Sequence, residues 1–223
     1  MEKTDHVIAG VIPARRGSKR FPGKNQHLLY YSLQAAKESE YLSKTIVSSD
    51  DQLFLEAAQW VMSCHIRYRP EDVSNDKATQ YAVIMDLLDH GYLHKDDILV
   101  LLQPTSPLRT GSDIDGAVYW FLDQCLPKGI ESLVSVAKVH EEPTCIVDEE
   151  GQFILDKINS GPYYFINGAI YICTMKFLME NRTFYQAGQT ERYIMPKYKS
   201  IDVDDQEDYK MATLIMGGLQ NGK

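Results

Sequence analysis

Five basic residues lie within ten positions near the start of the chain: Arg15, Arg16, Lys19, Arg20 and Lys24. Gly17 and Gly23 lie among them, and glycine allows the backbone to approach a ligand closely. Arginine and lysine form charge-assisted hydrogen bonds with phosphate oxygens. This stretch therefore predicts a site for a polyphosphate, and the alternative reading is a solvated basic turn.

The basic stretch matches neither of two common phosphate-binding motifs. A Walker A motif needs glycine, four residues, then Gly-Lys-Ser or Gly-Lys-Thr, and the dinucleotide fingerprint needs three glycines in a fixed spacing. Neither pattern occurs between Pro13 and Asn25. Kinase-like and dinucleotide-binding functions therefore lose support.

Two carboxylates near the end of the chain could hold a metal ion. Asp202 and Asp204 are two residues apart, so in a strand over 200–203 their side chains would point to the same face. Two hard oxygen ligands suit Mg²⁺ that bridges a triphosphate. Asp205, Glu207 and Asp208 are not expected to join them. The alternative role for Asp204 is to cap the closing helix.

Composition and charge narrow the class of protein. The chain has 223 residues, 44% of them hydrophobic, and its 23 basic against 31 acidic residues give a net charge of −8. This balance is typical of a globular protein of one domain and argues against a general nucleic-acid binder. No apolar run is long enough to cross a membrane, and residues 1–6 do not begin a signal peptide, so a cytoplasmic protein is expected. The cysteine spacing predicts neither zinc binding nor disulfides.

Apolar runs of strand length alternate with segments of helical period in the first half of the chain. Strands are expected over 7–12, 45–48, 65–68 and 98–103, and the last reads as a strand buried on both faces. Four apolar stripes predict the buried faces of the helices between and after them: Leu29, Leu33, Ala36; Leu53, Ala57, Trp60; Tyr81, Ile84, Leu88; and Ile114, Val118, Phe121. Thr110 and Asp113 have the spacing of a capping box for the fourth helix.

This alternation predicts an α/β fold with a mostly parallel sheet flanked by helices. The basic stretch follows the first strand, at the sheet edge where open α/β sheets bind ligands. Later in the chain, expected strands over 133–139, 145–147, 152–155 and 163–173 predict a hairpin-rich excursion at about 134–172. A short strand over 200–203 and a helix over 206–216 close the domain, which spans 1–223.

Several segments of the chain resemble one enzyme family. The residues from Ile12 to Asn25, IPARRGSKRFPGKN, resemble the signature loop of the acylneuraminate cytidylyltransferases. Further resemblances follow in the family's order: Arg69-Pro70 with Asp76 to Thr79, the turn from Gln103 to Arg109, Asn167 to Tyr171, and Ser200 to Asp204. The turn QPTSPLR is the most specific of these, and together the segments cover nearly the whole chain.

The resemblance implies a Rossmann-like nucleotidyltransferase fold whose excursion serves dimerisation, so that the protein is a homodimer. It implies transfer of CMP from CTP to the anomeric hydroxyl of a nonulosonic acid, with Mg²⁺ as cofactor and release of pyrophosphate. The sugar could be N-acetylneuraminate, legionaminate, pseudaminate or another nonulosonate.

The resemblance also assigns roles to residues. Arg15 and Lys24 are the expected catalytic residues, because they would neutralise the phosphates. The nucleotide site is expected to comprise Ala14, Arg15, Gly17, Ser18, Lys24, Asn25, Arg69, Ala78 and Thr79. The sugar site is expected to comprise Gln103, Thr105, Ser106, Asn167 and Tyr171, and the metal ligands are expected to be Asp202 and Asp204.

The sequence departs from the family pattern at three places. Arg16 stands where a small residue is usual, so its side chain is expected to turn outward. About six residues that usually follow Asn25 are missing, and Asn159 to Pro162 replaces a basic segment that helps to hold the sugar. Two alternatives therefore stay open: an enzyme for a different sugar, and a catalytically degenerate nucleotide-binding protein.

Overall fold

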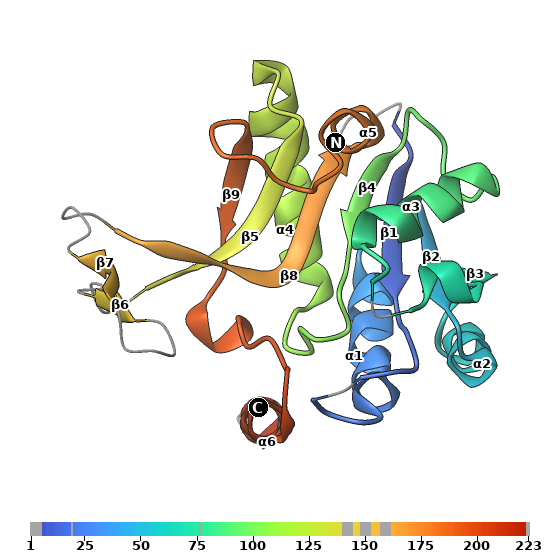
Figure 1. Cartoon of the computed structure of the whole chain (residues 1–223), viewed down its shortest axis with the longest axis horizontal. Helices are drawn as coiled ribbons and strands as arrows, with labels where there is room; N and C mark the ends of the chain where they lie inside the picture. Colours follow the sequence, from blue (N-terminus) through green and yellow to red (C-terminus); the bar gives the residue numbers. More distant parts are fainter. Residues whose placement is uncertain are drawn as a thin grey trace.

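A seven-stranded mixed sheet forms the centre of the fold (Figure 1). The computed structural model describes residues 6–18, 20–75, 77–139, 145–147, 153–156 and 162–221. In the described chain the sheet has the order β3-β2-β1-β4-β8-β5-β9. Its strands are β1 (Ile8–Pro13), β2 (Lys44–Ser49), β3 (His65–Tyr68), β4 (Ile98–Leu101), β5 (Ser132–Lys138), β8 (Tyr164–Thr174) and β9 (Thr190–Ile194). Only β8 runs antiparallel to its neighbours among these strands.

Helices cover both faces of this sheet. The helices are α1 (Lys24–Glu38), α2 (Gln52–Val61), α3 (Gln80–Asp89), α4 (Gly111–Trp120), α5 (Met175–Asn181) and α6 (Gln206–Asn221), with single turns η1 (Glu71–Val73), η2 (Phe121–Cys125), η3 (Leu126–Lys128) and η4 (Lys197–Lys199). One buried cluster joins the sheet to α1, α2 and α4, and a second joins its other face to α3 and α5. These layers confirm the predicted Rossmann-like arrangement.

The strand β4 shows why the sheet has this centre. All four of its side chains are buried, because α4 and α3 pack on its opposite faces. This confirms the prediction of a doubly buried strand, although the regular pairing ends at Leu101 and residues 102–103 already belong to the next turn. The other strands predicted in the first half are confirmed within one residue at each end.

Of the predicted helix stripes, the one on α2 was wrong. Leu53 is 71% and Trp60 90% exposed, whereas Phe54, Leu55 and Ala58 face the sheet. Both sets have helical spacing, and the set with adjacent Phe54 and Leu55 faces the sheet. Ile84 on α3 is buried and Tyr81 and Leu88 are partly buried, while the predicted stripes on α1 and α4 are fully buried.

Two further predictions of elements need correction. Residues 200–203 form no strand: Ile201 and Val203 pack against α6, and within the described part of the chain the backbone bond across from this stretch is that of the Val203 amide to the Thr105 carbonyl, at 2.8 Å. The edge strand β9 was not predicted, since its sequence, Thr-Glu-Arg-Tyr-Ile, lacks an apolar run. The closing helix α6 begins where predicted and runs to Asn221.

The long strands β5 and β8 extend beyond the main sheet, and the hairpin of β6 (Cys145–Val147) and β7 (Phe153–Asp156) lies at their far end (Figure 1). These elements match the predicted hairpin-rich excursion in position. The departure from the family pattern at residues 159–161, and the residues 140–144, lie outside the described chain. Among the described residues, no helix combines the length and the apolar character of a membrane span.

Candidate active site

A cavity of about 290 Å³ lies at the carboxyl ends of β1 and β4, the sheet edge where the sequence predicted a ligand. It brings together most of the predicted nucleotide-binding residues and part of the predicted sugar site: Arg15, Gly17, Ser18, Lys24, Asn25, Arg69, Ala78, Thr79, Gln103 and Thr105. The loop after β1, the segment between β3 and α3 and the turn after β4 therefore share one site. Lys19 and Asp76 lie outside the described residues.

The loop after β1 is fixed at both ends. The Ala14 amide donates to the Ser48 carbonyl at 2.9 Å and Ala14 is fully buried, so it holds the backbone of the loop but is not among the residues that line the cavity. Gly23 has φ +73°, a conformation that favours glycine, and it turns the chain into α1. The helix therefore begins at Lys24 itself, and Asn25 lies in its first turn.

Asn25 joins this loop to the first turn of α1. Its Nδ2 donates to the Arg15 carbonyl at 2.7 Å, while its buried Oδ1 has no partner among the described residues. Arg16 instead points to solvent, where its Nε lies 3.6 Å from Asp51 Oδ2. The outward orientation predicted for Arg16 is confirmed, and the cavity side of the loop is left to Arg15, Gly17 and Ser18.

Arg69 supplies a buried cation to the opposite wall. It is 4% exposed, its Nη1 lies 3.5 Å from the Val73 carbonyl, and its Nε and Nη2 have no partner in the described chain. Burial lowers the pKa of Arg69, an effect that Asp50 partly offsets. Buried polar atoms are normally paired, so these two nitrogens mark a place where a ligand supplies acceptors.

The wall beside Arg69 contains residues that the sequence reasoning missed. Val73, Ser74, Asn75, Gln80 and Val83 line the cavity together with Ala78 and Thr79. Thr79 Oγ1 accepts from the Ala82 amide at 3.1 Å and so caps α3 beside the cavity. The turn-forming pair Ser74-Asn75, between a strand and a helix, is the signal that could have indicated this wall.

The turn after β4 carries Gln103 and Thr105 into the cavity. Ser106 is buried in the same turn, and its Oγ has no partner among the described residues. Across from Gln103 lies Gly168 of β8, with φ +74°; a Cβ there would be 3.2 Å from Gln103 Oε1 and 3.5 Å from Asp202 Oδ2. These groups form one end of the site.

Asn167 and Tyr171 of β8 lie behind that end. The Asn167 amide is engaged inside the protein: Oδ1 accepts from Ser135 Oγ at 2.6 Å, and Nδ2 donates to Ser200 Oγ at 2.8 Å. Asn167 therefore shapes the strand here, and its contact with a sugar stays a prediction. Burial, together with the charge of Asp202, raises the pKa of Tyr171 to about 12.

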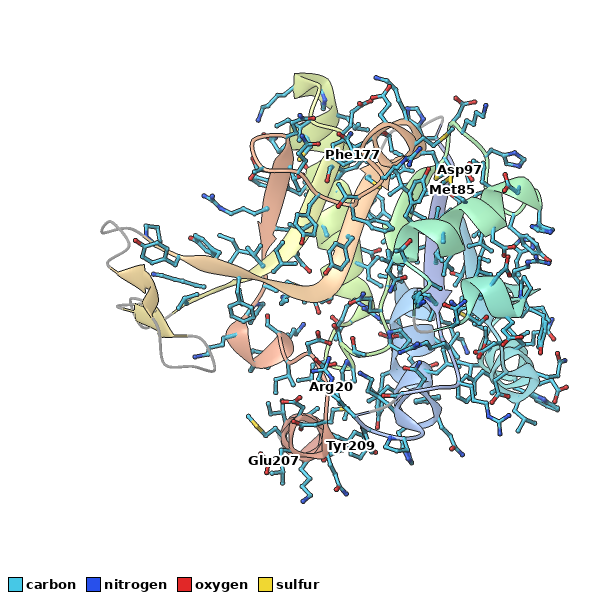
Figure 2. All side chains as sticks on the ribbon, viewed as in Figure 1. Arg20, Met85, Asp97, Phe177, Glu207 and Tyr209 are labelled. Atoms are coloured by element: carbon cyan, nitrogen blue, oxygen red, sulfur yellow. The ribbon has the colours of Figure 1, made fainter. Side chains whose placement is uncertain are left out.

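The two predicted metal ligands flank the cavity. Burial raises the pKa of Asp202, although a hydrogen bond with Thr105 acts against it. Asp204 Oδ1 lies 3.1 Å from Lys24 Nζ and its Oδ2 lies 3.0 Å from Arg20 Nη1. In Figure 2, Arg20 lies close to α6, near the labelled Glu207 and Tyr209. These contacts bring the end of the chain to the basic loop.

Asp205, and not Asp204, caps the N-terminus of α6. Asp205 Oδ1 accepts from the amides of Glu207 and Asp208, at 2.8 and 3.0 Å. Asp208 Oδ2 in turn accepts from the Asp204 amide at 2.9 Å. The Asp204 carboxylate is therefore not needed to begin α6, and it stays at the cavity with Lys24.

Comparison with known proteins gives the same picture over most of the chain. A family model described as cytidylyltransferase matches residues 9–211. A CMP-N,N'-diacetyllegionaminic acid synthase of Legionella pneumophila is 31% identical over 94% of this chain and 96% of its own length. An N-acylneuraminate cytidylyltransferase of Escherichia coli is also 31% identical over 93% of this chain, which spans only 52% of that longer protein.

A solved structure is similar in fold. The structure of a CMP:2-keto-3-deoxy-manno-octonic acid synthetase complexed with CTP superposes with a TM-score of 0.61, covering 95% of this chain and 99% of that one. Its sequence identity is 17%, so this likeness supports the arrangement of the sheet and helices alone.

Proposed function

The chain belongs to the cytidylyltransferase family, and on that premise we propose that it transfers CMP from CTP to the anomeric hydroxyl of a nonulosonic acid. The observation that carries the proposal is that one cavity joins the basic loop, the turn of Gln103 and the guanidinium of Arg69, whose Nε and Nη2 have no partner among the described residues. The relatives named above act on legionaminic and acylneuraminic acids, which makes a nonulosonate the best-supported acceptor.

The cavity can orient both substrates. Arg69 and the wall from Val73 to Thr79 would hold the cytidine, while Arg15, Lys24 and the backbone at Gly17 and Ser18 would hold the triphosphate. Gln103 and Thr105 would face the sugar, with Ser106, Asn167 and Tyr171 around them. Because most of the catalysis of such a displacement comes from alignment and charge stabilisation, fixed cations at the phosphates are the essential feature.

The reaction then follows from this orientation. The anomeric oxygen of the sugar attacks the α-phosphorus of CTP, the bond from that phosphorus to the bridging oxygen breaks, and pyrophosphate leaves with the electron pair. The hydroxyl loses its proton to solvent water as the new bond forms. Arg15 and Lys24 stabilise the charge that develops on the phosphate oxygens.

The residues present fit a magnesium ion. Burial and the nearby charge of Asp204 both raise the pKa of Asp202, and a bound cation relieves a cost of this kind. Mg²⁺ usually takes one or two carboxylates together with substrate phosphates. Asp202 and Asp204 would hold it, and when bound it would supply further neutralisation of the triphosphate.

We extend the proposal to assembly and location. A homodimer formed through the β5–β8 extension and its hairpin is supported by exposed apolar side chains there, Phe165 and Ile166. A cytoplasmic location is supported by the proposed donor, since CTP is a nucleotide of that compartment.

Pyrophosphate release tests the proposal. Wild-type protein with CTP and Mg²⁺ should release pyrophosphate with one of N-acetylneuraminate, legionaminate or pseudaminate, and not with octulosonate. Asp202→Ala should abolish release, while the matched variant Asp96→Ala, changed in an exposed loop at the other end of β4, should keep it. Release with octulosonate alone would indicate the different sugar, and CTP binding without release with any sugar would indicate a degenerate binder.

A further inference from the structure

Arg109 is a fully buried cation that none of the predicted roles includes. It lies at the end of the turn between β4 and α4, is 2% exposed and forms no ion pair with a carboxylate in the described chain. Asp113, whose charge acts on Arg109, is itself paired with Lys199 at 2.7 Å. Burial lowers the pKa of Arg109 to about 9. A buried charge without a counter-ion is costly, which calls for a compensating purpose.

The guanidinium links three parts of the fold. Nη1 donates to the Ala169 carbonyl at 2.6 Å and to the Gln103 carbonyl at 3.2 Å, and Nη2 donates to Ser32 Oγ at 2.6 Å. These acceptors belong to β8, to the turn after β4 and to α1. Arg109 therefore connects the β8 segment next to Gly168, the turn that carries Gln103, and α1, the helix that begins with Lys24.

The Ala169 carbonyl needs this donor because the sheet opens here. Pairing of β4 with β8 ends at Leu101 and Tyr171, and the register of β5 with β8 breaks between Tyr171 and Ile166. The backbone of the intervening residues is satisfied by side chains instead: the Ile170 amide donates to Ser135 Oγ at 2.8 Å, and the Ala169 carbonyl accepts from Arg109. The opening therefore has a fixed shape.

The Gln103 carbonyl is held even more firmly. It accepts from Arg109 Nη1, from Ser32 Oγ at 3.3 Å and from the Ser106 amide at 3.3 Å. The Gln103 side chain leaves this anchored backbone for the cavity and lies against Gly168. One guanidinium thus determines the distance between the two walls of the cavity at this end.

We propose that Arg109 is a positioning residue: it holds Gln103 against Gly168 and so orients the nonulosonic acid for attack. This inference rests on the proposed function. It acts through the Gln103 and Ala169 backbone and touches neither substrate. Lysine cannot replace it, because a single ammonium lacks the planar fork that spans two carbonyls and a hydroxyl.

Arg109→Lys tests the inference by separating the two substrates. We expect kcat/KM for the nonulosonate to fall about 10- to 100-fold, as a displacement of about 1 Å can cause, while KM for CTP changes less than about threefold. The matched control is Arg67→Lys, which alters another bidentate arginine: Arg67 of β3 is paired with Asp86 of α3 at 2.8 and 2.9 Å. It should lower the melting temperature and leave the ratio of the two kcat/KM values unchanged.

A double-mutant cycle identifies the route of the effect. In a Gln103→Ala background, Arg109→Lys should cost much less of the sugar kcat/KM than it does in the wild type, because the side chain it positions is gone. If Arg109→Lys does not fold, Ser32→Ala keeps the charge, removes one link to the Gln103 carbonyl, and should raise the sugar KM in the same direction.

The outcomes separate the two levels of the proposal. Wild-type activity with equal losses for CTP and sugar, or additive effects in the cycle, would overturn the positioning role and leave the proposed function standing. A wild-type protein that releases no pyrophosphate with any nonulosonate would overturn both.

Discussion

Three of the seven buried side-chain polar atoms that have no partner in the described part of the chain belong to residues that line the cavity. These atoms are Asn25 Oδ1 and the Arg69 nitrogens Nε and Nη2, and a fourth, Ser106 Oγ, lies in the turn that carries Gln103 and Thr105 into the cavity. Since a buried polar atom without a partner costs about 1 to 3 kcal/mol, a fold keeps such atoms together only where something else pairs with them. At the scale of the residue, these unpaired polar atoms therefore mark the place where a ligand would supply hydrogen-bond partners.

Arg69→Met should weaken CTP binding. Methionine keeps the length and packing of the side chain but removes the donors, and hydrogen bonds from a charged group are worth about 1.5 to 3 kcal/mol, which corresponds to about a 10- to 100-fold rise in Kd. The melting temperature should stay the same or rise, because the unpaired buried charge is gone. Calorimetric titration with CTP and a thermal scan measure both. Unchanged CTP affinity would remove Arg69 from the nucleotide site.

Gly168→Ala should impair use of the sugar. Its φ of +74° costs an alanine about 1 to 2 kcal/mol, and the added Cβ would press on Gln103 Oε1 at 3.2 Å. Gly129→Ala is the matched control, since Gly129 has the same φ of +74° but open space around it. Urea unfolding should show similar losses of stability in both variants, with a raised sugar KM in Gly168→Ala alone. Equal KM values would contradict the contact.

At the scale of the element, close packing of β9 against α4 depends on Gly116. A Cβ there would overlap the Tyr193 hydroxyl. Gly116→Ala should therefore reduce the free energy of unfolding by about 1 to 3 kcal/mol, as overpacking usually does. In a Tyr193→Phe background the loss should be smaller, because the overlapping oxygen is absent. Urea titration of the four proteins measures this, and an equal loss in both backgrounds would show that Tyr193 is not the obstacle.

The elements that the sequence predicted are those whose burial is complete. The run Ile98 to Leu101 and the stripe of Ile114, Val118 and Phe121 contact the core on every apolar side, so period and composition suffice. Where an element is covered on one side only, the signal fails. The helix α2 offers two apolar stripes, and the edge strand β9 has none; only the partners that these elements meet decide the outcome.

The sequence predicted the loops that line the site but not the buried residues that hold those loops in place. The segments after β1 and β4 carry short motifs that a sequence can show, and they line the cavity. Ser32, Ser135 and Arg109 act through an opening between strands that arises from pairing of distant residues, such as Leu101 with Tyr171. No local pattern reveals which carbonyl will lose its partner in the sheet.

At the scale of the whole molecule, the net charge of the chain and the charge of its cavity have opposite signs. The chain carries a net charge of −8, yet Arg15, Lys24 and Arg69 face one cavity. An acidic surface disfavours nucleic acids, whose many phosphates would meet it over a wide area, while a small triphosphate meets the cavity alone.

Assembly is the remaining property at this scale, and the β5–β8 extension leads to a prediction about it. Beyond the end of β9, only two strands pair, Ala137 with Phe165 and Lys138 with Tyr164. A two-stranded ribbon is marginally stable in water. Phe165 is exposed in this ribbon, and Ile166 is exposed at its base, opposite Val136; the two residues are adjacent and so lie on opposite faces. A second copy of the chain would cover them, so wild-type protein should sediment as a dimer.

Phe165→Asp with Ile166→Asp should convert this dimer to a monomer, because charges in an apolar contact lose their hydration without gaining partners. Leu53→Asp is the matched control, since Leu53 is 71% exposed on α2, away from the extension, and its replacement should leave the mass unchanged. Analytical ultracentrifugation at micromolar concentration measures all three proteins. A monomeric wild type, or a doubly substituted protein that stays dimeric, would show that the extension serves another purpose, whereas dissociation of that variant alone would assign the interface to these two side chains.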